Sequence, residues 1–212
     1  MTLQLYALSI DPVHIDRTLI IATRNKGKVR EIKHLLKPIK LKIISLLDLP
    51  KLSDIRETGR TFRENAVKKA VTITKRLNCT ALADDSGLEV RALGGKPGVR
   101  SARYAGPNPT TGKLCKKLLK AMSGKKDRRA RFVCDIAISR PGKKPIIIEG
   151  ICRGKIADKM IGSLGFGYDP VFIPSGYKKT FAQMPLTLKN RISHRGKALK
   201  KAKAYLDRIF PS

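Results

Sequence analysis

The sequence has few acidic residues. Of its 212 residues, 16 are Asp or Glu and 46 are Lys or Arg, which gives a formal net charge of +30. Adjacent carboxylates repel each other, and such a pair persists most easily where a cation or a proton transfer uses it. The neighbouring acids Asp84 and Asp85 therefore mark a place in this basic chain where chemistry is expected.

The sequence also lacks paired cysteines, long apolar runs and a secretory leader. Its four cysteines form no Cys-x-x-Cys pair, which argues against a zinc site and against a disulfide framework. Apolar runs such as 146–148 are far too short to cross a bilayer. Residues 1–16 contain no basic stretch followed by an apolar one, so no signal peptide is visible. These absences favour a cytoplasmic protein with reduced thiols and no membrane partner.

The positive charge by itself does not select a function. A protein that binds nucleic acid needs Lys and Arg concentrated on one face, whereas here they are spread through nearly every segment. Small polyanionic substrates would be attracted by the same field. The absence of an RNA-binding aromatic motif, a helix-turn-helix pattern or zinc spacing argues against nucleic acid as the partner. A basic nucleic-acid-binding protein without catalysis stays as the alternative hypothesis.

Hydrophobic periodicity predicts an α/β protein with a mixed sheet. We expect residues 1–17 to be an N-terminal extension and residues 18–212 to form one α/β domain. Strands are expected at 19–22, 41–46, 80–83, 131–139 and 145–153, and helices after the turn at 23–28, after the Thr61/Glu64 capping box, at 114–122 and after the cap Ser193.

The turn between the first expected strand and helix has the features of a phosphate site. A helix N-terminus presents unpaired N–H groups and a partial positive charge, and Lys26 and Lys28 add full charges. Thr23 and Asn25 supply short polar side chains. The spacing does not match a Walker A loop. An ordinary capped turn would explain the pattern equally well.

The acidic pair is predicted to stand at the end of the strand 80–83. A carboxylate there could hold Mg²⁺ and orient an attacking water, and Ser86 could bind a phosphate oxygen. Glu57 has no structural role that the local sequence explains, although it could simply be a solvated loop acid. An Asp-Ser-Gly turn of no catalytic meaning is the alternative interpretation.

Two later segments are candidates for recognition of a flat ring. Phe166 and Tyr168 alternate with glycines in 165–170, which exposes backbone for close approach. His194 and Arg195 stand at an expected helix start, where they could read carbonyl oxygens of a base or meet phosphate. Aromatic residues in such a pattern are more often part of the core, and a lone histidine is usually structural.

Taken together, these segments resemble one family, the Ham1-type inosine triphosphate pyrophosphatases. The resemblance extends over residues 19–206, and it is carried by the segments TRNKGKVRE, TFRENAVKKA, ADDSGLEVRALGGKPGVRSARYAG, GFGYDPVF and ISHRGKAL. It implies a homodimer of two-lobed subunits with a long mixed sheet flanked by helices and an active site in the cleft between the lobes. The implied activity is Mg²⁺-dependent hydrolysis of dITP, ITP and XTP to the monophosphate and pyrophosphate, which cleanses the nucleotide pool.

The resemblance also implies roles for individual residues. Asp85 would be the general base and a metal ligand with Glu57, while Asp84 would support the strand. The residues implied to hold the triphosphate are Thr23, Arg24, Asn25, Lys26, Gly27 and Lys28, and further contacts with the substrate are implied for Ser86 and Lys189. The base pocket would be lined by Phe166, Gly167, Tyr168 and Asp169. The 6-oxo group of the base would be read by His194 and Arg195.

The chain departs from the family pattern at four positions. Arg24 stands where glycine is usual, and Leu188 stands where an acid is usual. Arg100 replaces an aromatic residue, and Arg56 lies where many members have an extra acid, which makes Glu57 the least secure metal ligand. A pyrophosphatase acting on another modified nucleoside triphosphate is therefore kept as a third hypothesis.

Overall fold

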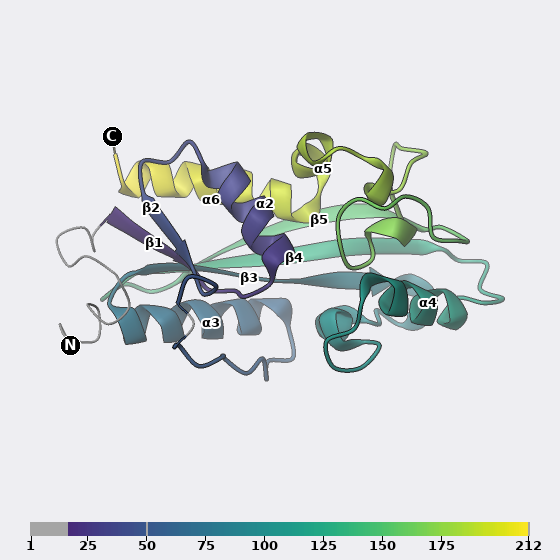
Figure 1. Ribbon diagram of the computed structural model, residues 1–212, viewed down its shortest axis with the longest axis horizontal. Coiled ribbons are helices and arrows are strands. Elements are labelled where there is room, and N and C mark those ends of the chain that lie inside the picture. Colours follow the sequence, from purple (N-terminus) through teal and green to yellow (C-terminus); the bar gives the residue numbers. More distant parts are fainter. Residues whose placement is uncertain (1–16, 50, 212) are drawn as a thin grey trace. The chain divides into compact units, whose positions relative to one another are not determined.

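The computed structural model describes residues 17–49 and 51–211, so the expected extension lies outside the described part of the chain except for Arg17. Figure 1 follows the chain through its strands and helices. The strands are β1 (Thr18–Ile21), β2 (Lys42–Ser45), β3 (Thr80–Val90), β4 (Arg129–Ser139), β5 (Ile146–Ile156) and β6 (Phe172–Pro174). The helices are α2 (Lys26–Leu36), α3 (Phe62–Leu77), α4 (Thr111–Ala121), α5 (Leu186–Ile192) and α6 (His194–Ile209), with short 3-10 turns at Arg91–Leu93, Gly98–Arg103, Asp169–Val171 and Phe181–Gln183.

The six strands form one sheet in the order β2-β1-β3-β4-β5-β6. Strand β1 pairs in parallel with both β2 and β3, whereas β5 and β6 are antiparallel. The mixed α/β class is therefore confirmed. None of the helices in 17–49 and 51–211 combines the length and the apolar character that crossing a membrane requires.

The chain divides into two compact units. Unit 1 comprises the chain up to Asp85, Asp135–Glu149 and the chain from Ala198 onward, and unit 2 comprises Ser86–Cys134 and Gly150–Lys197. Strands β3, β4 and β5 each contribute residues to both units. Each unit has its own buried core, as a self-supporting body requires.

The core of unit 1 is made by β1, β3 and one face of α3. Ala66, Ala70 and Ile73 recur at helical spacing and are fully buried. Helix α3 lies along one face of the strands, while α2 and the part of α6 in this unit lie along the other (Figure 1). The helix begins after the predicted cap Thr61, whose Oγ1 accepts from Glu64 N at 3.1 Å, but the second hydrogen bond of a capping box, from Thr61 N to Glu64, is replaced by one from Arg60. The Glu64 carboxylate accepts from Arg60 N at 2.7 Å.

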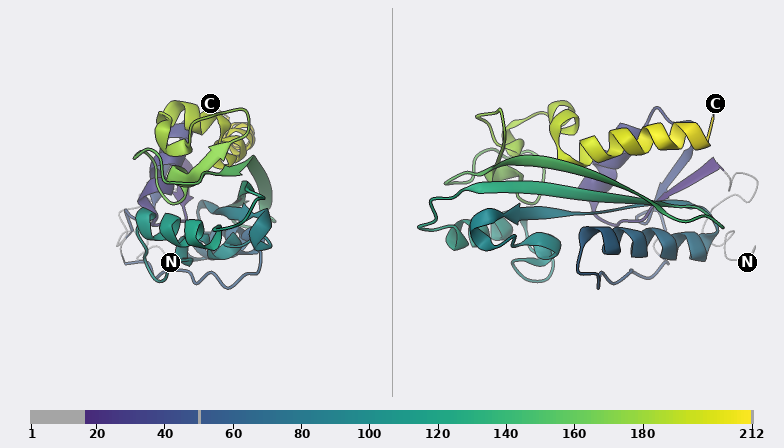
Figure 2. Two further views of the ribbon diagram at one scale, coloured as in Figure 1. Left: turned by 90° about the vertical axis from the view of Figure 1, so that its right-hand side faces the viewer. Right: turned by 180° about the vertical axis from the view of Figure 1, so that it is seen from behind.

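The core of unit 2 is aromatic. The ring of Phe172 lies 4.7 Å from that of Phe132 and 5.2 Å from that of Phe181, in edge-on and tilted arrangements that aromatic rings prefer. Helix α4 contributes Leu114 and Leu118 to the same core. Figure 2 shows the strands of this unit curling beside α4.

The sequence prediction was wrong about the end of β3. The strand was expected to stop at Ala83, but it continues through the two aspartates to Val90. Leu88 and Val90 are fully buried and Glu89 between them is not, which is the alternation of a half-buried strand. The acidic pair thus lies inside a strand, where the backbone fixes its direction, and not in a turn.

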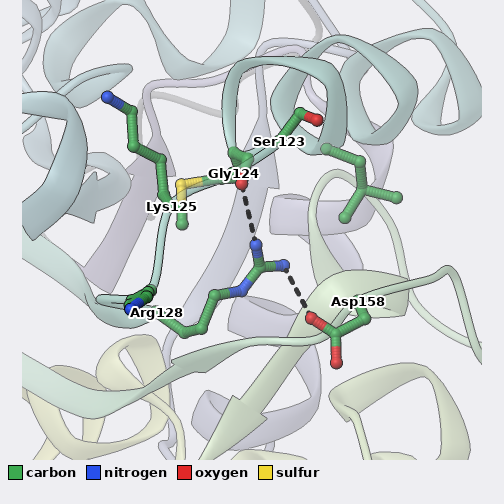
Figure 3. Close-up of a pocket in the computed structure, with 8 residues that line it drawn as sticks. Ser123, Gly124, Lys125, Arg128 and Asp158 are labelled. Atoms are coloured by element: carbon green, nitrogen blue, oxygen red, sulfur yellow. Dashed lines mark hydrogen bonds and ion pairs between the residues drawn. The ribbon is translucent and has the colours of Figure 1, made fainter.

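Arg128 lines a cavity of about 470 Å³ in unit 2 and connects the elements around it (Figure 3). Arg128 donates to Met122 O at 3.1 Å, to Ile156 O at 3.1 Å and to Ala157 O at 2.7 Å, and it lies 3.4 Å from the Asp158 carboxylate. Its rigid fork thereby joins the end of α4 to the end of β5.

We expect Arg128→Lys to lower the free energy of unfolding by about 1–3 kcal/mol, because the ammonium group is a single point and cannot reach the three separate carbonyl groups that the planar guanidinium spans. Urea denaturation of both proteins measures the difference. Arg129→Lys is the matched control, since Arg129 is largely exposed and bonds only Asp127; its expected change is below about 1 kcal/mol. Equal losses in the two variants would contradict the structural role of Arg128.

Candidate functional site

The predicted phosphate turn is formed between β1 and α2 in unit 1. Asn25 is the N-cap of α2, and its side-chain oxygen accepts from Lys28 N at 3.1 Å. Thr23 Oγ1 in turn accepts from Asn25 N at 3.2 Å. This capped start presents first-turn N–H groups that have no partner within the helix, beside the cations Lys26 and Lys28. The geometry suits an anion.

Lys28 connects this turn to the acidic pair. Its ammonium lies 3.3 Å from Asp84 Oδ1, and the Asp84 side chain is fully buried. A buried carboxylate is stable when a cation partners it, so Asp84 holds Lys28 in place. The role predicted for Asp84, to shape the strand end or to assist through water, stays a prediction.

Arg24 has a structural role in unit 1. Its guanidinium pairs with Asp54 at 2.7 Å and donates to Leu49 O at 3.2 Å. It also donates to the carbonyl oxygens of Leu46 and Leu52. The fork thus ties the segment 46–54 to the end of β1. A contact between Arg24 and substrate stays a prediction.

A second cluster in unit 1 surrounds Lys69, which the sequence analysis missed. Its ammonium donates to Glu57 Oε1 at 2.7 Å and to Asp84 O at 2.8 Å, and it lies 3.8 Å from Asp85 Oδ1. The two predicted metal ligands therefore share one ammonium group. Lys69 is buried, one helical turn after Asn65 on the packed face of α3.

Asn65 orients the predicted base. Its Nδ2 donates to Asp85 Oδ2 at 3.0 Å, while its Oδ1 accepts from Gly59 N at 2.8 Å. Both carboxylate oxygens of Asp85 thus face polar groups of α3. A polar pair at i and i+4 on an otherwise apolar helix face was the signal that could have found Asn65 and Lys69.

Burial and neighbouring charges shift the pKa values of this cluster in opposite directions. Burial raises the pKa of Asp85 above its usual value, although Lys69 and Lys28 oppose the shift. Burial acts to lower the pKa of Lys69, but the carboxylates of Asp85, Glu57 and Asp84 outweigh it, so the pKa is raised. Lys69 therefore stays charged, and Asp85 accepts a proton more readily than an exposed aspartate does.

The donor set of unit 1 fits Mg²⁺ bound together with a phosphorylated substrate. No group of three or more His, Cys, Asp or Glu side chains gathers into a metal site within residues 17–49 and 51–211. Mg²⁺ is commonly bound by only one or two carboxylates, with phosphate oxygens and water completing the shell. Glu57 and Asp85, which converge on Lys69, supply that number.

Unit 2 brings together most of the residues predicted to read the base. Asp169 Oδ2 accepts from Lys189 Nζ at 2.6 Å and from Phe166 N at 2.8 Å. One buried carboxylate thereby fixes both a cation and the start of the aromatic segment. Gly165, with φ of 79°, is required here, because a Cβ at this position would overlap with the Asp169 carboxylate.

Two cations lie close to the Phe166 ring. Lys189 Nζ is 4.8 Å and Arg195 Cζ is 5.7 Å from its centroid, distances at which cations are attracted to a ring face. Arg195 also donates to Ser86 Oγ at 2.7 Å. The structure thus places Ser86, Phe166, Lys189 and Arg195 in one cluster of unit 2.

Three further predicted residues are held by the unit 2 core. The His194 ring stacks on Phe132, with centroids 4.5 Å apart and an interplanar angle of 9°. Tyr168 is buried and donates its hydroxyl to Ser101 O at 2.9 Å; burial raises its pKa. Gly167 N donates to Thr111 Oγ1 at 3.1 Å. These contacts give each of the three residues a packing role, and their contacts with substrate stay predictions.

Comparison with known proteins gives a consistent result. A family model described as Ham1 family matches residues 19–205. The chain is 50% identical over 193 residues to a dITP/XTP pyrophosphatase of Bacillus licheniformis, covering 90% of this chain and 98% of that one. It is 47% identical over 192 residues to one of Desulfotalea psychrophila, covering 91% and 86%.

Solved structures agree with the sequence comparison. The Ham1 protein of Staphylococcus aureus superposes with a TM-score of 0.82 at 41% identity, covering 91% of this chain and 100% of that chain. A HAM1 protein of Coxiella burnetii also gives a TM-score of 0.82, at 39% identity and with coverage of 90% and 98%.

Proposed function

The chain belongs to the Ham1 family, and on this basis we propose that it hydrolyses non-canonical purine nucleoside triphosphates such as dITP, ITP and XTP to the monophosphate and pyrophosphate. The observation that carries the proposal is the buried Asp85 carboxylate, which Asn65 orients at 3.0 Å beside Lys69. Relatives that carry the printed name dITP/XTP pyrophosphatase support the choice of substrate.

In the proposed reaction, a water molecule attacks the α-phosphorus of the triphosphate. Asp85 accepts a proton from this water, a role that its raised pKa favours. The bond between the α-phosphorus and the bridging oxygen breaks, and pyrophosphate leaves with the electron pair. Phosphoryl transfer needs little beyond positioning and charge stabilisation, so one oriented carboxylate suffices as the base.

The cations of unit 1 serve the charge of the triphosphate. The start of α2 with Lys26 and Lys28 is the proposed anion site, where backbone N–H groups and ammonium groups act together. Lys28 is already directed by Asp84. Glu57 and Asp85 would hold Mg²⁺, which neutralises phosphate charge when it is bound.

Unit 2 is proposed to select the base. The face of Phe166 offers a flat apolar surface, and Arg195 supplies N–H donors beside it. A 6-oxo purine accepts hydrogen bonds where adenine donates them, so a donor at this point favours hypoxanthine and xanthine and leaves the amino group of adenine unpaired. His194 is the second proposed reader of the 6-oxo group. We further propose that the enzyme acts as a cytoplasmic homodimer.

A substrate panel tests the proposal. With Mg²⁺ present, dITP and XTP are expected to turn over at least about tenfold faster than dATP, because the amino group of adenine leaves a donor of the site unpaired. The panel also includes dGTP and dUTP. The products from dITP should be dIMP and pyrophosphate in equal amounts, as ion-exchange chromatography and a pyrophosphate-specific assay would measure. Release of orthophosphate would contradict the proposed reaction, and preferred turnover of dUTP would favour another modified-nucleotide specificity.

A further inference from the structure

Unit 2 contains a second cavity that the proposed reaction does not use. Its volume is about 420 Å³, within the range of small-molecule sites. Its lining includes Val90, Ala130 and Gly154. Four arginines line the cavity, and we call it the arginine pocket: Arg91, Arg129, Arg131 and Arg153.

The strand pattern explains why the arginines face away from the core. On β4, Ala130 and Phe132 are buried, whereas Arg129 and Arg131 are exposed. On β5, Cys152 is buried and Arg153 after it is exposed. Successive side chains of a strand point to opposite faces, so neighbouring strands place these three cations on the face opposite the core. In the right-hand view of Figure 2, no helix of unit 2 lies in front of β4 and β5.

Acidic residues hold two of the four arginines in position. Arg131 pairs with Glu89 at 2.6 Å, and Arg129 bonds both oxygens of Asp127 at 2.9 and 3.0 Å. Arg129 also lowers the pKa of Asp127 to about 2, so this acid stays charged. Four cations against these two acids leave an excess of two positive charges at the pocket.

The remaining two arginines are available to a ligand. Arg91 lies 3.5 Å from Asp127, a looser contact than that of Arg129, and 65% of its side chain is exposed. Arg153 is exposed, and its backbone oxygen accepts from Ser175 N at 2.9 Å at the edge of the pocket. Arginine forks match phosphate oxygens in a bidentate manner. The Arg128 cavity differs, because there the guanidinium is already committed to three carbonyl oxygens.

We propose that the arginine pocket binds the phosphate groups of a small anionic ligand, either free pyrophosphate or a nucleoside monophosphate. The concave shape suits a compact molecule. The site is separate from Asp85 and from the Phe166 cluster by its residues, and it does not depend on the proposed reaction.

The test follows the arginine side chains themselves. Protein labelled with ¹⁵N at arginine is titrated, without divalent cation, with pyrophosphate in one arm and dIMP in the other, and the Nε–H signals are recorded. Arg153 and Arg91 signals are expected to shift and saturate with at least one of the two ligands. The ligand with the lower dissociation constant shows whether the pocket prefers free pyrophosphate or a nucleoside monophosphate. Absence of saturable shifts at Arg153 in both arms would overturn the proposal.

Two double variants distinguish binding in the arginine pocket from attraction of the ligand by the net charge of the protein. The double variant Arg91→Ala/Arg153→Ala removes two charge-assisted contacts, so the dissociation constant of the ligand should rise at least about tenfold. The Nε–H signal of Arg131 reports the binding in this variant. The matched control Lys178→Ala/Lys179→Ala removes two exposed charges of unit 2 and should stay within about twofold. An equal loss in both would mean that net charge alone attracts the ligand, and the proposal would fail.

Glu89→Gln changes affinity in the opposite direction. Removing this acid frees the Arg131 fork and raises the local charge, so binding should become tighter, whereas simple damage to the fold would weaken it. The Arg91→Ala/Arg153→Ala variant should keep the dITP turnover of the parent protein. A parallel loss of turnover would make the pocket part of the catalytic site and would contradict the assignment of a separate site.

Discussion

Replacing Asp85 by asparagine is expected to lower kcat for dITP hydrolysis by about 10²- to 10⁴-fold, the range that a positioned general base contributes. Asparagine has the same shape but cannot accept the proton of the attacking water. Steady-state release of pyrophosphate at saturating dITP measures the effect. Thermal unfolding of the variant shows whether the fold is kept.

Glu89→Gln is the matched control for this change. It removes a carboxylate from the same strand, four residues further along, where Glu89 pairs with Arg131 in unit 2. Its kcat should stay within about twofold of the parent value, because it leaves the base in place. If Asp85→Asn kept more than about a tenth of the parent kcat, the role of Asp85 as general base would be refuted.

Lys69→Met is expected to lower the free energy of unfolding by about 3–5 kcal/mol, the usual cost of removing one partner from a buried ion pair. The variant leaves the carboxylates of Glu57 and Asp85 without the ammonium they share. If these two acids bind a divalent cation, added Mg²⁺ should stabilise Lys69→Met more than the parent protein. Urea denaturation with and without Mg²⁺ measures both effects.

Lys68→Met provides the comparison, because Lys68 immediately precedes Lys69 on α3 and is exposed. Its ammonium group donates a hydrogen bond to Thr58 Oγ1 at 2.8 Å. Its expected change is within about 0.5 kcal/mol, as for most surface substitutions. A loss below about 1 kcal/mol for Lys69→Met would show that the buried cluster does not need its ammonium.

Local signals in the sequence predicted the start of the fold well. The apolar run 19–22, the short polar side chain of Asn25 and the spacing of Val29 and Ile32 indicate β1, the turn and α2, and the observed strand is Thr18–Ile21. Ser193 was likewise recognised as the cap of α6, and its Oγ accepts from Gly196 N at 3.1 Å. Such signals are readable because each depends on residues within about one helical turn.

Features that depend on distant residues were missed. Gly87 suggested a turn, but the alternation beyond it serves a core that the sequence does not display. Lys69 was one of 46 basic residues, and only the fold brings it to Glu57, twelve positions away. Helix α5 has seven residues, too few for a clear helical period.

The site residues show the same division. Their identity came from motifs, but their contacts came from tertiary structure. The guanidinium group of Arg24 binds Asp54, which lies thirty positions further along the chain, and no local pattern predicts that choice. The same is true of the stacking of His194 on Phe132, since the two rings belong to elements far apart in the chain.

The single carboxylate of Asp169 has a consequence for how base preference can evolve. Because its contact with Lys189 joins two side chains, substitutions at Asp169 and Lys189 should be strongly non-additive. Phe166 is bound through its backbone N–H, which every residue except proline keeps. Under the proposed role of unit 2, a change of base preference can therefore begin at the Phe166 ring, whereas Asp169 and Lys189 have to change together.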